Sequence, residues 1–327
     1  MYLKHCFQSL IVFGLLLAAC FAQQPPKFVF DRPDRIDLLK FTEDGKFLAA
    51  VTSRDFKIYD TASGEISGRL KSTHYANSAI FSKDGKFLIT GNNDGKVRVW
   101  ETANYSLLKT LAVTEWSIYS LAISADGRIL GVDVGDGTIE LWNLDEQKKV
   151  AAFGAPGQRM AAMNFSPDEK FFAGFNLQSE LTVWKPATGE KIFSVARANQ
   201  SPVTYCRKGR ELAISDYSAV NFLDSRTGKT TRTLTIPKEI APLFPRAAGM
   251  NAYFLGKVIV SPDCRTAAIG NWKKKTISLL DLKTAKVKKV LDYSASPETN
   301  YIVVFSPNGK LIAAGSSGGK IHIWQTE

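Results

Sequence analysis

A six-residue element occurs seven times along this chain, and each copy is followed by a second shared element. The copies of the first are FTEDGK (41–46), FSKDGK (81–86), ISADGR (123–128), FSPDEK (165–170), YCRKGR (205–210), VSPDCR (260–265) and FSPNGK (305–310). The copies of the second are FKIYD (56–60), VRVWE (97–101), IELWN (139–143), LTVWK (181–185), VNFLD (220–224), ISLLD (277–281) and IHIWQ (321–325). Successive copies of the first element start 40, 42, 42, 40, 55 and 45 residues apart. Two elements that keep this spacing predict seven similar structural units.

Each repeat has the pattern of four short β-strands. In the second repeat we expect strands at 77–81, 87–91, 97–100 and 106–111, with an Asp-Gly turn after the first of them. The second strand is apolar or small throughout, as in FLITG (87–91), which is typical of a strand that is buried on both faces. Because a single sheet of this size cannot cover both of its own faces, the sequence predicts sheets that stack face to face in a ring.

The pattern resembles the WD40-repeat family of seven-bladed β-propellers over residues 27–327. The resemblance lies in the tryptophans at one position of the third strand, where Tyr or Leu stands in the other repeats: Trp100, Trp142, Trp184, Trp324, Tyr59, Leu223 and Leu280. The Gly-His pair of that family is absent, and after the N-terminal segment the only histidines are His74 and His322. The resemblance implies an all-β fold of seven four-stranded antiparallel blades, in which the family's hydrogen-bonded polar tetrad is mostly missing.

The two ends of the repeat region predict how the ring closes. The seventh copy stops after its third strand, at Glu327, and therefore lacks an outer strand. The segment KFVF (27–30) precedes the first copy and has the composition of a strand. We expect it to pair with the last strand and so remove a free sheet edge.

The N-terminus predicts export. Lys4 is followed by an uncharged, mostly apolar run from Cys6 to Ala22, which has the length and place of a signal peptide over residues 1–22. Two processing routes remain open: Leu17-Ala18-Ala19-Cys20 resembles a lipobox, in which Cys20 would carry a lipid, and cleavage after Ala22 would release a free protein. Residues 23–327 are then a single propeller domain in the periplasm or outside the cell.

The remaining cysteines, Cys206 and Cys264, lie 58 residues apart, at the ends of neighbouring blades. A disulfide requires Cα atoms within about 7 Å. Because neighbouring blades splay apart, we expect two free thiols. Without a CxxC or a Cys/His cluster, the sequence predicts no metal site.

The sequence lacks the motifs of common catalytic sites. It has no HExxH, Walker A loop or GxSxG, and the polar residues near the first strand differ from repeat to repeat. Asp133 and Asp136 lie close together, but aspartates in such turns are usually turn formers. We therefore predict a non-catalytic binding protein or scaffold without a cofactor. The alternative is a cell-envelope enzyme of hydrolase or lactonase type, with several carboxylates or histidines converging at the channel mouth.

The most promising binding surface is the face formed by the turns between second and third strands and by the loops between repeats. One of these loops is about 14 residues longer than its neighbours, and its excess, between 237 and 256, is rich in apolar and aromatic residues. Aromatic residues and arginine dominate interface energetics. The predicted anchors for a protein or peptide partner on this top face are Tyr75, Trp116, Arg159, Arg246, Phe254 and Trp272. The alternative is that the aromatic residues of the long loop fold down and plug the channel.

The chain carries a net charge of +11. In an exported protein this charge indicates an anionic envelope or a solvated surface rather than nucleic acid. Basic residues are concentrated at Lys273, Lys274 and Lys275 and again in KTAKVKK (283–289). This blade edge is interpreted as a solvated, aggregation-resistant surface, with contact to an anionic membrane or an acidic partner as the alternative. We expect a monomer.

Overall fold

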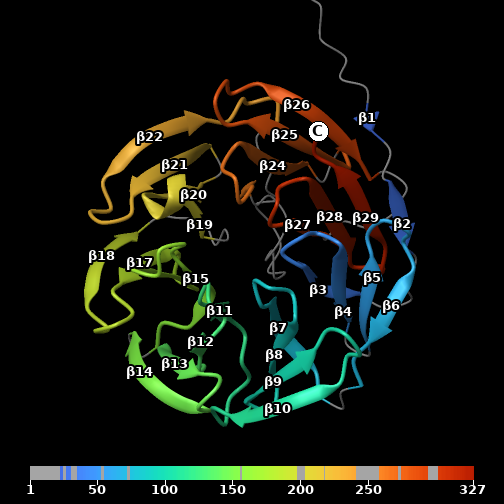
Figure 1. The fold of residues 1–327 in the computed structure, drawn as a ribbon. Coiled ribbons are helices and arrows are strands. Elements are labelled where there is room, and N and C mark those ends of the chain that lie inside the picture. The colour runs from blue at the N-terminus through green and yellow to red at the C-terminus, as the bar shows by residue number, and fades with distance from the viewer. Residues whose placement is uncertain are drawn as a thin grey trace, which may run out of the picture.

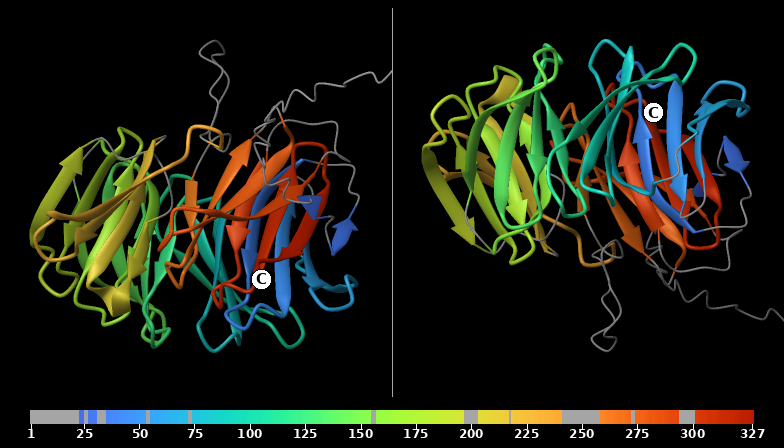
Figure 2. Two further views of the ribbon diagram at one scale, coloured as in Figure 1. Left: turned by 90° about the horizontal axis from the view of Figure 1, so that it is seen from above. Right: turned by 90° about the horizontal axis from the view of Figure 1, so that it is seen from below.

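In the computed structural model, seven β-sheets stand as blades around a central axis (Figure 1). The structure describes residues 23–24, 27–30, 35–52, 55–71, 74–154, 157–196, 203–216, 218–240, 258–271, 274–293 and 301–327. Seen from the side, the strands run between two faces of the ring (Figure 2). We call the face with the turns between second and third strands and the loops between blades the top face, and the opposite one the bottom face. The predicted seven-bladed propeller is confirmed.

The first four blades each contain four consecutive strands. They are β3 (Ile36–Phe41), β4 (Phe47–Thr52), β5 (Phe56–Asp60) and β6 (Ile66–Arg69); β7 (Ala76–Phe81), β8 (Phe87–Asn92), β9 (Lys96–Glu101) and β10 (Leu107–Ala112); β11 (Leu121–Ile123), β12 (Ile129–Asp133), β13 (Thr138–Asn143) and β14 (Lys148–Gly154); β15 (Met160–Phe165), β16 (Phe172–Asn176), β17 (Glu180–Trp184) and β18 (Lys191–Ala196).

The last three blades complete the ring, and two of them incorporate a segment from the start of the chain. They are β19 (Thr204–Cys206), η1 (Arg207–Gly209, a 3-10 turn), β20 (Glu211–Ser215), β21 (Ala219–Asp224) and β22 (Thr230–Thr235); β23 (Val258–Val260), β24 (Thr266–Asn271), β25 (Thr276–Asp281) and β26 (Val287–Asp292), with β1 (Gln23–Gln24); β27 (Tyr301–Phe305), β28 (Leu311–Ser316) and β29 (Ile321–Gln325), with β2 (Phe28–Phe30).

The repeated six-residue element folds into one bottom turn in most blades. In blade two the Ser82 hydroxyl donates to Asp84 Oδ1 (2.7 Å), which also accepts the backbone N–H of Lys86 (3.1 Å), and Phe87 N–H donates to Ser82 Oγ (2.9 Å). The same Ser–Asp pair closes the turns of blades three, four and six. Side-chain hydrogen bonds of this kind explain why the turn residues recur at fixed offsets. In blade five Cys206 takes the place of the serine, and the chain forms η1 instead.

The core lies between adjacent blades. All residues of β16 are buried, and the tryptophans Trp100, Trp184 and Trp324 are at most 4% exposed. Trp142 is half-buried and donates its indole N–H to Glu140 Oε2 (2.9 Å). Each blade thus covers the apolar face of its neighbour, as the repeat pattern predicts.

The ring closes through β2, as expected. Phe28 pairs with Ile323 and Phe30 with Ile321, antiparallel, and the backbone N–H of Lys27 donates to Ile323 O (2.6 Å). The N-terminal strand therefore supplies the outer strand of blade seven.

A second N-terminal strand was not expected. β1 lies on the outer edge of β26 in blade six, with Gln23 opposite Val290 and Gln24 opposite Leu291. The pairing is parallel, so blade six has five strands instead of four.

The expectation of free thiols is wrong, because Cys206 and Cys264 form a disulfide between blades five and six, with Cα atoms 5.7 Å apart. Cys206 ends the innermost strand of blade five, and Cys264 lies in the bottom turn that follows the innermost strand of blade six. Neighbouring blades splay apart at their outer strands, whereas their inner strands converge on the axis. The two cysteines lie where the blades are closest.

No helix in the described part of the chain has the length and apolar character needed to cross a membrane.

Candidate functional site

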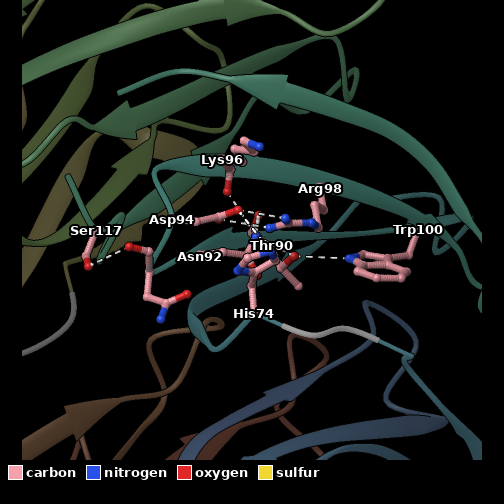
Figure 3. A network of polar contacts seen from close by, with 9 residues as sticks. His74, Thr90, Asn92, Asp94, Lys96, Arg98, Trp100 and Ser117 are labelled. Atoms are coloured by element: carbon pink, nitrogen blue, oxygen red, sulfur yellow. Dashed lines mark hydrogen bonds and ion pairs between the residues drawn. The ribbon is translucent and has the colours of Figure 1, made fainter. Parts of the chain in front are cut away.

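The top-face loop between β10 and β11 is hydrogen-bonded to the blades on both sides of it. In blade two, Gly95 O accepts the backbone N–H of Thr114 (3.1 Å), and Asn93 O accepts the hydroxyl of Ser117 (3.1 Å) (Figure 3). In blade three, Val134 O accepts the hydroxyl of Thr114 (3.1 Å). The backbone of this loop is therefore held in one position.

Trp116 lies in the middle of this loop, and its side chain is 66% exposed. Its backbone N–H donates to Thr114 Oγ1 (3.2 Å), and a Cβ on Gly135 would come within 2.9 Å of the Trp116 Cβ. The base of the side chain is thus packed, while most of the indole faces solvent. A large aromatic group on an ordered loop loses little conformational entropy on binding.

Beside this loop, Arg159 stacks on Tyr119. The guanidinium carbon lies 4.4 Å from the centre of the Tyr119 ring, a cation–π contact between blades four and three. Tyr119 is 48% exposed, and Arg159 is partly buried. Tyr119 and Trp116 are thus two exposed aromatic residues three positions apart in the same loop.

Asp133, at the end of β12, is fully buried. Burial raises the pKa of this carboxyl to about 6, although a hydrogen bond from the Gly135 N–H and the charge of Arg159 oppose the shift. Asp136 accepts the backbone N–H of Thr138 (2.7 Å). Both aspartates therefore cap the turn between β12 and β13, which is the role expected of them.

Tyr75 extends the arrangement to blade one. Its hydroxyl hydrogen-bonds Asp37, which also forms an ion pair with Arg35 (Nε to Oδ1, 2.9 Å). Burial, with the negative charge of Asp37 next, raises the pKa of Tyr75, and Tyr119 contributes in the same direction. We call the resulting set the aromatic–arginine arc: Arg35, Asp37, Tyr75, Trp116, Tyr119 and Arg159.

Blade two contains a polar network at the turn to which Ser117 of the Trp116 loop is hydrogen-bonded (Figure 3). Arg98 donates two hydrogen bonds to the Asp94 carboxylate (3.0 and 2.7 Å), and His74 Nε2 lies 3.6 Å from Asp94 Oδ2. The hydrogen bond from Arg98, with its charge, lowers the pKa of Asp94. The Trp100 indole donates to Thr90 Oγ1 (3.0 Å). Blade two thus retains a polar network among repeats in which the family tetrad is degenerate.

Three of the six predicted anchors, Tyr75, Trp116 and Arg159, belong to the arc. Arg246, Phe254 and Trp272 lie outside the described residues, as do most of the long loop, Lys273 and Cys20. Lys274 is exposed and Lys275 partly buried in the top turn of blade six.

The prediction of anchors missed Arg35, Asp37 and Tyr119. A signal for them is present in the repeat, because Arg35 lies six residues before Phe41, at the same offset as Tyr75 and Arg159. Asp37 and Tyr119 share the offset of four residues before the repeat's first position. The side chains at these two offsets meet across blade boundaries.

Within the described ranges, no group of three or more His, Cys, Asp or Glu side chains is placed to hold a metal ion. At the described part of the top rim, Asp37 is paired with Arg35 and Tyr75, while Asp133 is buried in a different blade.

Comparison with known protein families shows which family this chain belongs to. Residues 43–287, well over half of the chain, match the family described as outer membrane protein assembly factor BamB. The chain belongs to this BamB family of β-propellers. Residues 295–325 also match the WD domain, G-beta repeat family, so the WD40 resemblance is confirmed.

Several WD-repeat proteins are related to this BamB-family chain. Serine-threonine kinase receptor-associated protein of Gallus gallus is 23% identical over 284 residues, which is 85% of this chain and 63% of that protein. WD repeat and SOCS box-containing protein 1 of Danio rerio is 24% identical over 253 residues, 75% of this chain and 57% of that protein. Telomerase protein component 1 of Rattus norvegicus is 31% identical over 113 residues, 34% of this chain and 4% of that protein. The chain spans less than two thirds of each of these relatives.

Proposed function

We propose that this protein is an exported scaffold that binds a protein or peptide partner through the aromatic–arginine arc. The observation that carries the proposal is Trp116, an indole that is 66% exposed on a loop hydrogen-bonded to two blades. Exposed apolar side chains that lie together mark protein–protein interaction sites, and Trp116 and Tyr119 are both exposed in this loop. Trp, Tyr and Arg are the residue types enriched in interface hot spots, and all three are present in the arc.

The chemistry of the arc indicates the kind of partner. Trp116 and Tyr119 offer flat apolar surface, and the Arg159 guanidinium stacked on Tyr119 offers hydrogen-bond donors beside it. A segment that combines an apolar or aromatic side chain with a carboxylate or backbone carbonyl would complement both features. The alternative of a channel-mouth enzyme would need converging catalytic groups, and no observation of the described rim favours it.

Three observations support export. The disulfide between Cys206 and Cys264 is of a kind that persists in oxidising compartments. The apolar run from Cys6 to Ala22 has the pattern of a signal peptide, with lipidation of Cys20 or cleavage after Ala22 as the two routes. The family description, an outer membrane protein assembly factor, is compatible with a place in the cell envelope.

The test replaces Trp116 and Arg159 together by alanine. A partner is first identified by cross-linking in native envelopes, and its affinity for the purified protein is then measured by titration. Because truncation of a hot-spot residue costs about 2 kcal/mol or more, the double variant should bind at least tenfold more weakly. The loss in thermal stability should be small, because Trp116 is mostly exposed and the cation–π contact of Arg159 with Tyr119 is worth about 1 kcal/mol.

A matched control is available on the bottom face. Phe87, the first residue of β8, and Arg128, in the bottom turn of blade three, are an exposed aromatic residue and an exposed arginine on that face. The Phe87→Ala, Arg128→Ala variant should bind the partner normally. Unchanged binding by the top-face variant, or an equal loss in both variants, contradicts the proposal.

A further inference from the structure

The bottom face of the ring carries a strong local charge at blades five and six. In blade five the bottom turns present five exposed basic side chains: Arg207, Lys208, Arg210, Arg226 and Lys229. Only Arg207 has an ion-pair partner in the described part of the chain, Glu211, which is itself buried. The other acidic residue there, Asp224, accepts hydrogen bonds from the turn backbone.

Blade six continues this surface with four more exposed basic residues: Arg265, Lys283, Lys286 and Lys288. None of them has an ion pair within the described ranges. The two nearby carboxylates, Asp263 and Asp281, accept hydrogen bonds from their own turns. Blades five and six together thus present nine basic and four acidic residues, a net charge of +5. We call this surface the basic sector.

Other parts of the bottom face are balanced. The same turns of blades three and four contain six basic residues (Arg128, Lys148, Lys149, Lys170, Lys185, Lys191) and six acidic ones (Asp126, Asp145, Glu146, Asp168, Glu169, Glu190). Some of them are paired with one another, such as Lys185 with Glu190 at 2.7 Å and Arg128 with Asp145 at 3.9 Å. A charged surface that serves solubility alone needs no such asymmetry, because mixed charges also keep proteins soluble.

The start of the propeller lies beside the basic sector. β1 pairs with the outer strand β26, and Gln23 is opposite Val290, two residues from Lys288 (Figure 1). Because the pairing is parallel, the N-terminal end of β1 is directed toward the end of β26 that leads back to Lys286 and Lys283. The apolar run that ends at Ala22 immediately precedes β1 in the sequence.

We propose that the basic sector rests on the anionic headgroups of a lipid bilayer. Basic residues next to a membrane-associated segment are attracted to anionic lipid, and several together give stable association where one hydrophobic group alone binds marginally. The sector lies on the bottom face at blades five and six, whereas the aromatic–arginine arc lies on the top face at blades one to four. The membrane and the protein partner would thus be bound by opposite faces, and this inference does not depend on the proposed partner site.

The test uses the chain from Gln23 to Glu327, which contains every described strand of the ring and no apolar leader. Binding is measured by flotation with vesicles of phosphatidylcholine, alone or with about a third phosphatidylglycerol. We expect binding to the anionic vesicles only, and loss of binding at high salt. The partition coefficient changes about fivefold per basic residue near such a surface. Replacing Lys283, Lys286 and Lys288 by Gln should therefore lower binding on the order of 100-fold.

The matched control replaces Lys148, Lys170 and Lys191 by Gln, which removes the same charge from the balanced blades. This variant should retain vesicle binding. Absence of binding to anionic vesicles overturns the proposal, as does an equal loss in both triple variants, which would indicate net charge alone. Binding of polyglutamate or single-stranded DNA through the basic sector without binding of vesicles also overturns it, in favour of an acidic polypeptide or a nucleic acid.

Discussion

Replacing Cys264 by alanine removes the cross-link between blades five and six and should destabilise the protein substantially. The disulfide joins residues 58 positions apart. Loop-closure entropy for a loop of that length corresponds to about 4 kcal/mol at room temperature. Cys264 is the better position for this change, because it is partly exposed whereas Cys206 is 2% exposed and would leave a cavity.

The assay is urea unfolding followed by tryptophan fluorescence, without reductant. Cys264→Ala should lower the free energy of unfolding by about 4 kcal/mol, and Cys206→Ala by the same amount or slightly more. The double variant should be no less stable than Cys206→Ala alone, because one cross-link can be lost only once. Reductant should destabilise the wild type and leave the variants unchanged. Two titratable thiols in the unfolded, unreduced wild type, or additive effects of the two substitutions, would refute the reasoning.

Two further changes test the top rim. Gly95→Ala places a Cβ 1.8 Å from Thr114 O, whereas Gly85→Ala, at the same φ of +71°, meets nothing within 4 Å. Both substitutions should lower the free energy of unfolding by about 1–2 kcal/mol, because an alanine is strained in the left-handed backbone conformation. Gly95→Ala should lower it by about 2 kcal/mol more and should weaken partner binding. Equal losses in urea unfolding would contradict the packing of the Trp116 loop. Burial raises the pKa of Asp133 from 3.8 to about 6, so the native state binds its proton more tightly than the unfolded state. The wild type should then gain up to about 3 kcal/mol relative to Asp133→Asn as the pH falls from about 7 to about 4, and a constant difference in unfolding free energy over this range would argue against a buried charge.

The blades could be predicted from the sequence because the information that specifies them is local. The Ser–Asp turn of blade two is closed by residues within five positions of each other, so the pattern is visible in the chain itself. The pairing of β2 with β29 could also be predicted from the sequence. The last repeat lacks an outer strand, and an additional strand at the other terminus can fill that position.

Features that depend on contacts between blades were harder to predict. The disulfide was missed because its formation depends on how closely the inner strands of two blades approach, which spacing along the chain does not indicate. The two-residue strand β1 has no periodicity that could identify it. The arc was predicted in part: the offset within the repeat identified Tyr75 and Arg159, and Trp116 was identified as an aromatic residue beside this rim. The ion pair of Arg35 with Asp37 and the stacking on Tyr119 are properties of neighbouring side chains in space.

The joining of β2 to β29 has a consequence for the order of events during synthesis. A ribosome makes Phe28–Phe30 long before the partner strand, Ile321–Gln325, because all seven blades are synthesised between them. The early strand cannot pair until the last blade has been synthesised. A contact of such long sequence separation slows folding. Any chain that stops short of Ile321 leaves β28 with an open edge and β2 without its partner strand, and such edges are prone to aggregation. Closure of the ring therefore requires synthesis through blade seven, and shorter products expose strand edges that the closed ring covers.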